Sequence, residues 1–457
     1  MRDSAISASS AAKAGKRAVS ILIDQNEFRR TAELVLQTSS GDHTMVYLTD
    51  VTGGTTRFAN NQIVQNLNTR RLSIAIQVAF GRQHGTASTT DLSAGAVRET
   101  LRRAERVARA SPDDPEYLPP VAPQQYAELS AARPETMAAG APRRLAEARV
   151  AIELCAADKL TAAGIVASSS AAVGIAASSG LFGYEQRTEA RFGVTATAED
   201  SSGWAANVHR SVDHLAVRDR TLVAINKARR AAHPKEIGAG RYTVILEPAA
   251  VAGLLSYMMW MLDAKSYYKG DSPFKGKLGQ SVMDSRLTLQ NRPDHPDLLG
   301  ARFTPDGLPS TGCIWIERGV LRELMYDRYT ANEHGVARIC TLEAPSLSGE
   351  GAVGERVEDL IRTTARGILV TNFWYIRSVN PTDLTLTGMT RDGTFLVEDG
   401  EIRAPTRNFR FHESPMSAFS RIQAFTAPAE ASTTESNKML VPALKIEDFN
   451  FSSVTRF

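Results

Sequence analysis

The pattern of apolar and polar positions divides the first half of the chain into strands and helices. Runs in which every second residue is apolar predict half-buried strands, and apolar residues three and four apart predict amphipathic helices. Gly53-Gly54 separates the first two strand-like runs, so we expect a turn there. The predicted strands are Thr44–Thr49, Thr56–Asn60, Leu72–Phe80, Thr86–Thr89, Gly164–Ala177, Glu189–Thr197 and Trp204–His209. The predicted helices are Asn26–Leu36, Ser93–Ala110, Arg143–Lys159 and Asp213–Ala232.

The order of these elements occurs twice along the chain. Each time, a strand leads through a glycine-containing hairpin into a short return strand, and a helix ending in basic residues follows. Residues 71–76 parallel residues 191–196, and Val97–Arg109 parallels Val217–Arg230. We interpret this as an internal duplication of α+β units; the alternative is a chance recurrence of two common hairpin–helix motifs.

The second half of the chain, after the proline and glycines of residues 234–240, has a different pattern. Short strands separated by Asp-Gly and Arg-Gly turn signals predict a β-rich, barrel-like domain. Residues 249–262 are apolar on every face but too short to cross a bilayer, so we expect one buried core helix. The predicted fold class is α+β, with an N-terminal domain at 26–237 and a C-terminal domain at 238–457.

Three segments fall outside these domains or interrupt them. Residues 1–25 form a basic, Ala- and Ser-rich arm that we interpret as flexible, with a transit peptide as the alternative. Ser111–Pro142 holds seven of the twenty prolines, which predicts an extended excursion over the surface. Thr426–Lys438 is a second polar excursion, and Leu440–Phe451 is predicted to close the chain as a strand.

Composition and charge exclude several functional classes. The chain has 457 residues, of which 43% are hydrophobic and 23% charged, as in soluble proteins of about two or three domains. Its net charge is +3 with scattered basic residues, which argues against nucleic acid, and no apolar run suits a membrane span. Cys155, Cys313 and Cys340 are far apart, which argues against a disulfide framework or structural zinc site and favours the reducing cytoplasm.

The histidines of the chain offer few candidate metal sites. His412-Glu413 is the one His-Glu pair, but Met416 and Ser417 stand where a zinc-binding helix would need its second histidine.

Two other histidine arrangements are worth testing against the structure. Glu333-His334 together with Cys340 supplies three candidate ligands but no fourth. His209 and His214 are placed to face one another across a hairpin-to-helix corner, although scattered histidines are usually hydrogen-bonded structural groups.

Aromatic and arginine side chains are concentrated in residues 372–377 and 390–393. One interpretation is a groove that binds an extended peptide as an added strand and pairs its carboxylates with arginines. The alternative is that Phe373 and Tyr375 fill the core of the β-rich domain. The candidate substrate-binding residues are Tyr375, Arg377, Arg391 and His412.

Short motifs along residues 26–451 follow the order and spacing of one known family. In the second half these are Val244–Pro248 with Leu254-Leu255, Lys269–Gly279, Thr304–Ser310, Ile316–Leu321, Asp399–Ile402 and Pro442–Ile446. In the first half they are Arg57–Asn60, Gln65-Asn66 and Gly85–Leu92. With these motifs the chain resembles the TldD/PmbA (TldD/TldE) family of two-subunit zinc peptidases.

The zinc-binding motif of that family has no counterpart here. In the metal-bearing subunit the buried helix carries His-Glu-x-x-x-His, and the aligned positions hold Ser256, Tyr257 and Met261. No cysteine after Cys340 replaces the family's later ligand. The resemblance therefore implies a TldE/PmbA-type subunit with no metal or catalytic residue of its own, and zinc on a partner subunit.

These observations predict a cytoplasmic, non-metallated subunit that pairs with a zinc-bearing TldD-like paralogue. It would help to bind unfolded or leader-peptide substrates, and it would need neither nucleic acid nor a membrane. A heterodimer is expected, with a homodimer as the alternative assembly. The alternative function is a stand-alone peptide-binding or scaffold protein without a proteolytic role.

Overall fold

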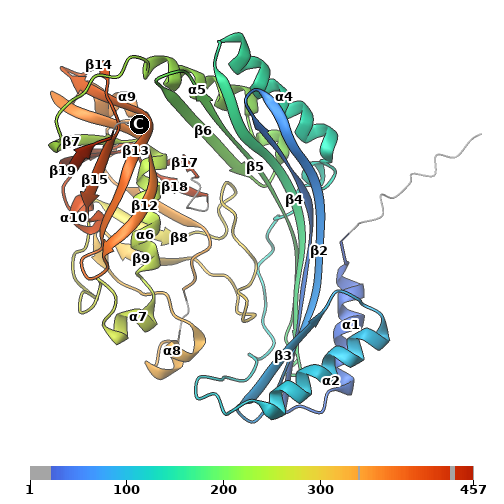
Figure 1. Cartoon of the computed structure of the whole chain (residues 1–457). Helices are drawn as coiled ribbons and strands as arrows, with labels where there is room; N and C mark the ends of the chain where they lie inside the picture. The colour runs from blue at the N-terminus through green and yellow to red at the C-terminus, as the bar shows by residue number, and fades with distance from the viewer. Residues whose placement is uncertain (1–21, 338–339, 433–437, 456–457) are drawn as a thin grey trace, which may run out of the picture.

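The computed structural model describes residues 22–337, 340–432 and 438–455. A long curved sheet built from the first half faces a C-terminal half that contains a β-barrel and a second sheet (Figure 1). Most of the predicted flexible arm lies outside the described residues. Its last part is packed, however, because Leu22 and Ile23 are buried and the Ile23 amide donates to Asp50.

The N-terminal sheet has six antiparallel strands in the order β3-β2-β1-β4-β5-β6. Its strands are β1 (His43–Ala59), β2 (Gln62–Phe80), β3 (Gln83–Thr89), β4 (Thr161–Ala177), β5 (Phe182–Thr197) and β6 (Ser202–His209). Its helices are α1 (Gln25–Thr38), α2 (Ala94–Ala110), α3 (Pro134–Met137), α4 (Ala141–Ala157) and α5 (Val217–Arg230), with a 3₁₀ turn at Val212–His214. The four long helices cover one face of the sheet, and the other face turns toward the C-terminal half (Figure 1).

The two halves of this sheet repeat each other about the central β1–β4 pair. Each consists of a helix, three antiparallel strands and a second helix, and the sequence repeat predicted the last two strands and the helix that follows them. The return strand of each half contains a glycine against which the following helix packs. A Cβ on Gly85 would overlap the backbone of Ala104 and Ala108, and one on Gly203 would overlap that of Ala224 and Ala228. The same close approach of helix and strand is thus built in both halves.

The predicted turn at Gly53-Gly54 is wrong. β1 runs straight through both residues, which pair with β2 on one side and β4 on the other. A Cβ on Gly53 would overlap the backbone of Ser168, and one on Gly54 would overlap the guanidinium of Arg144. Glycine is needed here for close packing inside a strand rather than for a turn.

The C-terminal half contains a closed barrel of five strands in the order β12-β7-β19-β15-β13, with β12 pairing back to β13. A second sheet has the order β10-β9-β8-β11-β18-β17. The barrel strands, with the flanking β14 and β16, are β7 (Gly240–Leu246), β12 (Arg366–Asn380), β13 (Thr385–Glu398), β14 (Glu401–Pro405), β15 (Phe409–Glu413), β16 (Ile422–Phe425) and β19 (Leu444–Val454). The second sheet consists of β8 (Leu287–Asn291), β9 (Cys313–Glu317), β10 (Val320–Leu321), β11 (Pro345–Gly349), β17 (Ala429–Ala431) and β18 (Met439–Val441).

The predicted buried helix is α6 (Pro248–Trp260), which packs between barrel strands β7 and β12 and strands β17 and β18 of the second sheet. Nine of its residues are buried, which matches its apolar sequence. Within the described part of the chain, no helix is long and apolar enough to cross a membrane. The remaining helices are α7 (Ala264–Lys269), α8 (Arg328–Glu333), α9 (Val357–Arg362) and α10 (Pro415–Phe419).

Two predicted segments differ from the structure. Leu440–Phe451 is not one strand, because the chain leaves the second sheet after β18 and enters the barrel with β19. The proline-rich excursion has little regular structure, as expected, but it does more than cover the surface. Its Tyr126 hydroxyl donates to the Gly307 carbonyl at 2.7 Å, and the Tyr126 ring packs on Phe303, so the excursion ties the two halves together.

Candidate functional site

Helix α6 carries the three positions that the family resemblance assigns to zinc chemistry. Ser256 is buried, and its hydroxyl donates to the Ala252 carbonyl at 2.8 Å within the helix. The Tyr257 hydroxyl donates to the Ile376 carbonyl of β12 at 2.6 Å. Met261 caps the helix and packs against the hydrophobic core. The Tyr257 hydrogen bond thus attaches the helix to the barrel and Met261 packs against the core, whereas the Ser256 hydroxyl is satisfied within the helix itself.

This set of side chains does not fit a zinc ion. Protein zinc sites use thiolate, imidazole and carboxylate ligands. Ser256, Tyr257 and Met261 instead offer two hydroxyls that donate to backbone carbonyls and one thioether. No step of a metal-dependent reaction is assigned to this helix.

The outer face of the barrel carries a group of side chains that we call the outer aromatic cluster: Trp374, Tyr375, Arg377 and Arg391. The rings of Trp374 and Tyr375 are among the exposed large side chains, at 43% and 51%. The Arg377 guanidinium lies 4.1 Å from the Tyr375 ring centroid, and that of Arg391 lies 4.4 Å from the Trp374 centroid. Both are cation–π contacts, and their modest attraction helps to hold the exposed rings in one orientation.

A bulge in β12 turns Tyr375 outward. The pairing of β12 with β13 shifts register between Trp374 and Arg377, and Tyr375 has a φ of 56°. Phe373 points the other way, is 6% exposed, and packs against the Phe411 ring at 4.7 Å. Phe373 therefore lies in the core, whereas Tyr375 is exposed and does not fill the core.

His412 shares the outer face of the barrel but lines a separate hollow. Thr387 of β13 pairs with Arg377 of β12 on one side and with His412 of β15 on the other. Directly opposed residues point to the same face of a sheet, so Arg377 and His412 lie on the same face. The hollow beside His412 has a volume of about 790 Å³ and includes the cationic side chains of Arg241 and Lys277. Asp383 and Glu413 also line it, and Arg241 pairs with Asp448 at 2.8 Å, so the hollow carries charges of both signs.

Arg391 lines another hollow, of about 540 Å³, between the barrel and the N-terminal sheet. Beside it, Asp392 is buried and accepts a hydrogen bond from the Ser202 hydroxyl of β6 at 2.8 Å. Burial raises the pKa of the Asp392 carboxyl, against the opposing effects of Ser202 and Arg391. The four predicted binding residues therefore do not meet in one pocket: Tyr375 and Arg377 adjoin, whereas Arg391 and His412 lie at different hollows.

The most spacious of these hollows, about 820 Å³, lies between α5 and the start of α6, and the sequence did not predict it. Lys227 of α5 and Glu247, the N-cap residue of α6, form an ion pair there at 2.6 Å. Its lining comes from many segments far apart in the sequence, including Trp204 and Ile402. No local sequence signal identifies such a hollow.

The predicted meeting of His209 and His214 is confirmed. Their ring centroids lie 4.4 Å apart, and His209 Nε2 is 3.2 Å from His214 Nδ1. The Ser211 amide donates to His209 Nδ1, so the neutral His209 ring carries its proton on Nε2, toward His214. Burial, and then the charges of Lys438 and His214, lower the pKa of His209.

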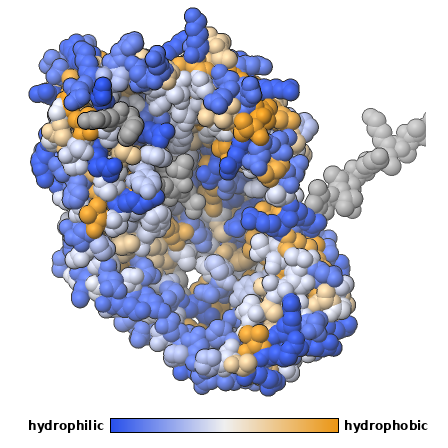
Figure 2. Space-filling view, viewed as in Figure 1, coloured by the Kyte–Doolittle hydropathy of each residue, from blue (hydrophilic) through white to orange (hydrophobic). Residues whose placement is uncertain are grey.

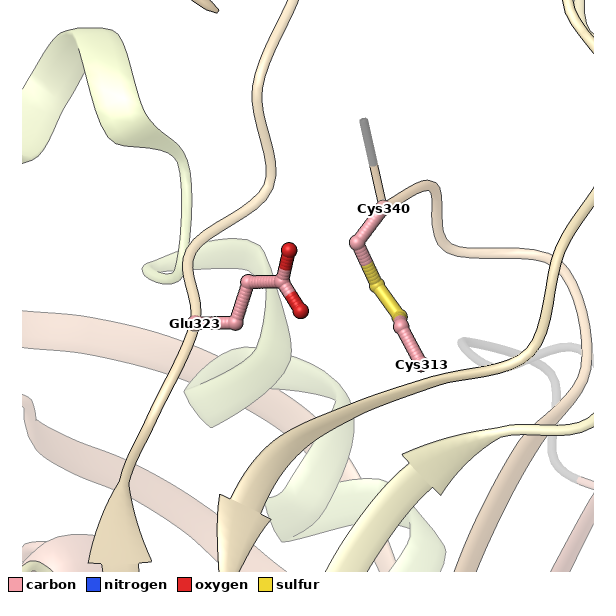
Figure 3. Close-up of side chains that lie close together, drawn as sticks. All are labelled: Cys313, Glu323 and Cys340. Carbon is pink, nitrogen blue, oxygen red and sulfur yellow. A yellow bond between two sulfur atoms is a disulfide. The ribbon is translucent and has the colours of Figure 1, made fainter. Parts of the chain in front are cut away.

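Cys313 and Cys340 are joined as a disulfide, which their spacing along the chain did not predict. Their Cα atoms lie 6.0 Å apart, across a sequence separation of 27 residues. The Glu323 carboxylate points toward the two sulfur atoms (Figure 3). Cys340 therefore meets Cys313 and Glu323 rather than the predicted Glu333-His334 pair, since His334 stacks on a tyrosine of α7.

Comparison with known proteins agrees with the fold. Models of the PmbA/TldA metallopeptidase match three consecutive parts of the chain: domain 1 at residues 45–108, the central domain at 137–233 and the C-terminal domain at 239–453. The chain belongs to the PmbA/TldD family.

Similar proteins occur in bacteria and archaea. This PmbA/TldD-family chain is 23% identical to the "Metalloprotease PmbA homolog" of Haemophilus influenzae over 415 residues, 83% of this chain and 87% of that protein. It is 27% identical to an uncharacterized protein of Methanocaldococcus jannaschii over 122 residues, and it spans 29% of the length of that protein. The crystal structure of TldE from Thermococcus kodakarensis superimposes with a TM-score of 0.82 at 19% identity, covering 93% of this chain and 99% of TldE. That likeness shows a shared fold.

Proposed function

We propose that this PmbA/TldD-family chain is the non-metallated subunit of a heteromeric zinc metallopeptidase in the cytoplasm. It pairs with a zinc-bearing TldD-like paralogue, on which hydrolysis takes place. Its own part is to complete the assembly and to bind unfolded or leader-peptide substrates.

One observation carries this proposal. By resemblance, the helix that bears the zinc motif in the metallated subunit corresponds to α6, which is buried between the barrel and the second sheet and carries Ser256, Tyr257 and Met261 at the aligned positions. On this proposal the chain keeps the fold, and residues that pack or hydrogen-bond take the positions of the zinc ligands. This is expected of a subunit that contributes binding surfaces rather than catalysis.

The outer aromatic cluster supports the substrate-binding part of the proposal. Exposed Trp374 and Tyr375 offer flat apolar area to side chains of an extended peptide, and the neighbouring guanidinium groups suit its carboxylates. The hollow beside His412 adds further charged groups, both cationic and anionic, on the same face of the barrel. Such a surface favours peptides that are unfolded and carry both aromatic and acidic residues.

The test compares the chain alone with the chain co-expressed with a zinc-bearing paralogue. We expect a 1:1 complex that cleaves an unfolded polypeptide, and no peptidase activity from the isolated chain even after zinc is added. Activity of the isolated chain with zinc would contradict the proposal. Failure to form any complex would favour the alternative, a stand-alone peptide-binding or scaffold protein.

Surface variants test the role of the outer aromatic cluster in the same complex. Tyr375→Ala and Trp374→Ala are each expected to raise KM for the polypeptide by about tenfold with little change in kcat, since each removes roughly 1–2 kcal/mol of contact. Val64→Ala, at an apolar position of β2 that is 61% exposed, is the matched control and should leave KM unchanged. An unchanged KM in both cluster variants would remove this surface from substrate binding.

A further inference from the structure

Three potential metal ligands converge outside the surfaces described for substrate binding. The ligand atoms of Cys313, Glu323 and Cys340 all lie within 4.8 Å of one another (Figure 3). Both cysteines are buried, at 4% and 1% exposure, and the glutamate is half-buried. Within the described residues, this is the one group of three such side chains close enough to share an ion.

The backbone brings these three residues together by hydrogen bonds independent of the disulfide. Asn291, at the end of β8, pairs with Cys313 at the start of β9. The buried side-chain oxygen of Asn291 accepts the amides of Glu343 and Ala344, at 3.3 Å and 2.8 Å, and so holds the segment that follows Cys340. One asparagine therefore places the two cysteines side by side.

The third residue is positioned by the β9–β10 hairpin. Its turn contains Gly319, with a φ of 78°, and the chain returns along β9. The Glu323 amide then donates to the Trp315 carbonyl at 3.2 Å. Trp315 lies two residues after Cys313, so residue 323 stays at the same end of the hairpin as the cysteine.

We propose that Cys313, Cys340 and Glu323 form a redox-controlled site for a thiophilic divalent cation of the zinc class. Two thiolates and one carboxylate are typical ligands of zinc, and a water molecule can complete a tetrahedral shell. The disulfide is the oxidised, metal-free state of the site. The site is separate from helix α6, and its cation would be structural, so the chain would still carry no catalytic zinc ion. The proposal does not depend on the proposed function.

The two states interconvert by a balanced exchange. A small dithiol reductant gives two electrons and two protons to the disulfide, which leaves two thiols and a cyclic disulfide of the reductant. The cation then displaces one proton from each thiol and binds the two sulfurs and the carboxylate. In a reducing compartment the thiol state predominates. The bound cation, rather than the disulfide, then links Cys313 of β9 to Cys340.

Metal titration of the full chain tests the site. After reduction with a dithiol and its removal, we expect one Zn²⁺ bound per chain, and none in the oxidised chain. Cys313→Ser and Cys340→Ser should abolish this binding, and Glu323→Gln, which keeps the side-chain shape, should weaken it at least tenfold. Cys155→Ser is the matched control, because Cys155 is buried and unpaired, and it should bind Zn²⁺ normally.

Co²⁺ provides a second readout that does not depend on activity. Bound through two thiolates it should show sulfur-to-metal charge-transfer absorption, which disappears in Cys313→Ser. A reduced chain that exposes three thiols on denaturation and yet binds no Zn²⁺ would overturn the proposal. Zn²⁺ binding that persists in both cysteine variants would do so as well. Neither result bears on whether the chain pairs with a zinc-bearing paralogue.

Discussion

Arg144 shows how a single buried side chain determines its surroundings. It is 1% exposed, lies under the N-terminal sheet, and donates to the Ser168 hydroxyl at 3.2 Å and to Asn68, with no carboxylate among these partners. Burial lowers its pKa. The guanidinium lies where a Cβ of residue 54 would stand, so the glycine of β1 is required by a residue ninety positions later in the chain.

His209 gives a prediction about pH. Burial lowers its pKa, so near pH 6 the unfolded chain binds more protons than the folded chain does. The free energy of unfolding should therefore fall as pH drops below about 6.5. Lys438 and His214 face the ring and oppose its protonation, whereas Glu430 favours it.

Urea unfolding between about pH 7.5 and about pH 5.5 measures this effect. His209→Gln should flatten the dependence of stability on pH in that range. His233→Gln is the control, since the side chain of His233 is 94% exposed, its 3.3 Å ion pair with Asp200 is open to solvent, and its loss should change the slope far less. An equal slope in wild type and His209→Gln would refute the assignment.

At the scale of elements, the paired glycines Gly85 and Gly203 make a prediction about the duplicated fold. Alanine at either position must push α2 or α5 away from its return strand, because the obstacle is helix backbone. Each substitution should lower the free energy of unfolding by about 1–3 kcal/mol, as for other overpacked sites. Similar losses at both positions would show that the two halves use the same packing.

Gly95→Ala is the matched control for these variants. Gly95 lies in α2 with open space around its Cβ position, so alanine there should be neutral or stabilise by up to about 1 kcal/mol. Denaturant unfolding of the three variants checks the contrast. A loss at Gly95 as large as at Gly85 would mean that the close approach of the helix backbone is not what makes Gly85 and Gly203 sensitive to alanine.

Sequence patterns predicted elements better than their ends or partners. The helical stripes of α2 and α5 and the uniformly apolar α6 were evident from periodicity alone. The polar first half of β2 was missed, because its exposed side chains show no alternation although its backbone pairs with β1 throughout. Strand pairing depends on distant backbone, so a local pattern does not contain it.

At the scale of the whole molecule, polar contacts join the N-terminal sheet and its helices to the C-terminal half. Lys227 and Glu247 form one of them, with side chains that are 18% and 20% exposed. A double-mutant cycle with Lys227→Met and Glu247→Gln should give a coupling free energy of about 1–2 kcal/mol, because partial burial strengthens the pair.

The exposed pair Arg102–Glu99 on α2 provides the comparison, with side chains that are 65% and 52% exposed. Its coupling free energy should be at most about 0.5 kcal/mol. If the two cycles gave equal values, the Lys227–Glu247 pair would contribute no more than an ordinary surface pair to joining the two halves.

The sequence also predicted some features of the candidate site and missed others. Tyr375 and Arg377 are two residues apart, and the sequence named both as candidate binding residues, with a core position as the alternative for Tyr375. The disulfide at Cys313 and Cys340 was missed, since the contact arises from the pairing of β8 with β9 and from the hydrogen bonds of Asn291. A contact that depends on three segments cannot be inferred from the residue spacing within any one of them.

The sequence by itself determined the α+β class, the repeat of hairpin and helix, the buried helix α6, and the absence of a His-Glu-x-x-x-His motif along the chain. Each of these features follows from short-range periodicity or from residue identity, both of which depend only on the local sequence. Only the tertiary structure decided that β1 is one strand, that the barrel closes through β12 and β13, and that two distant cysteines meet. These features depend on contacts between segments far apart in the chain, whose free energy is gained only when the whole fold assembles.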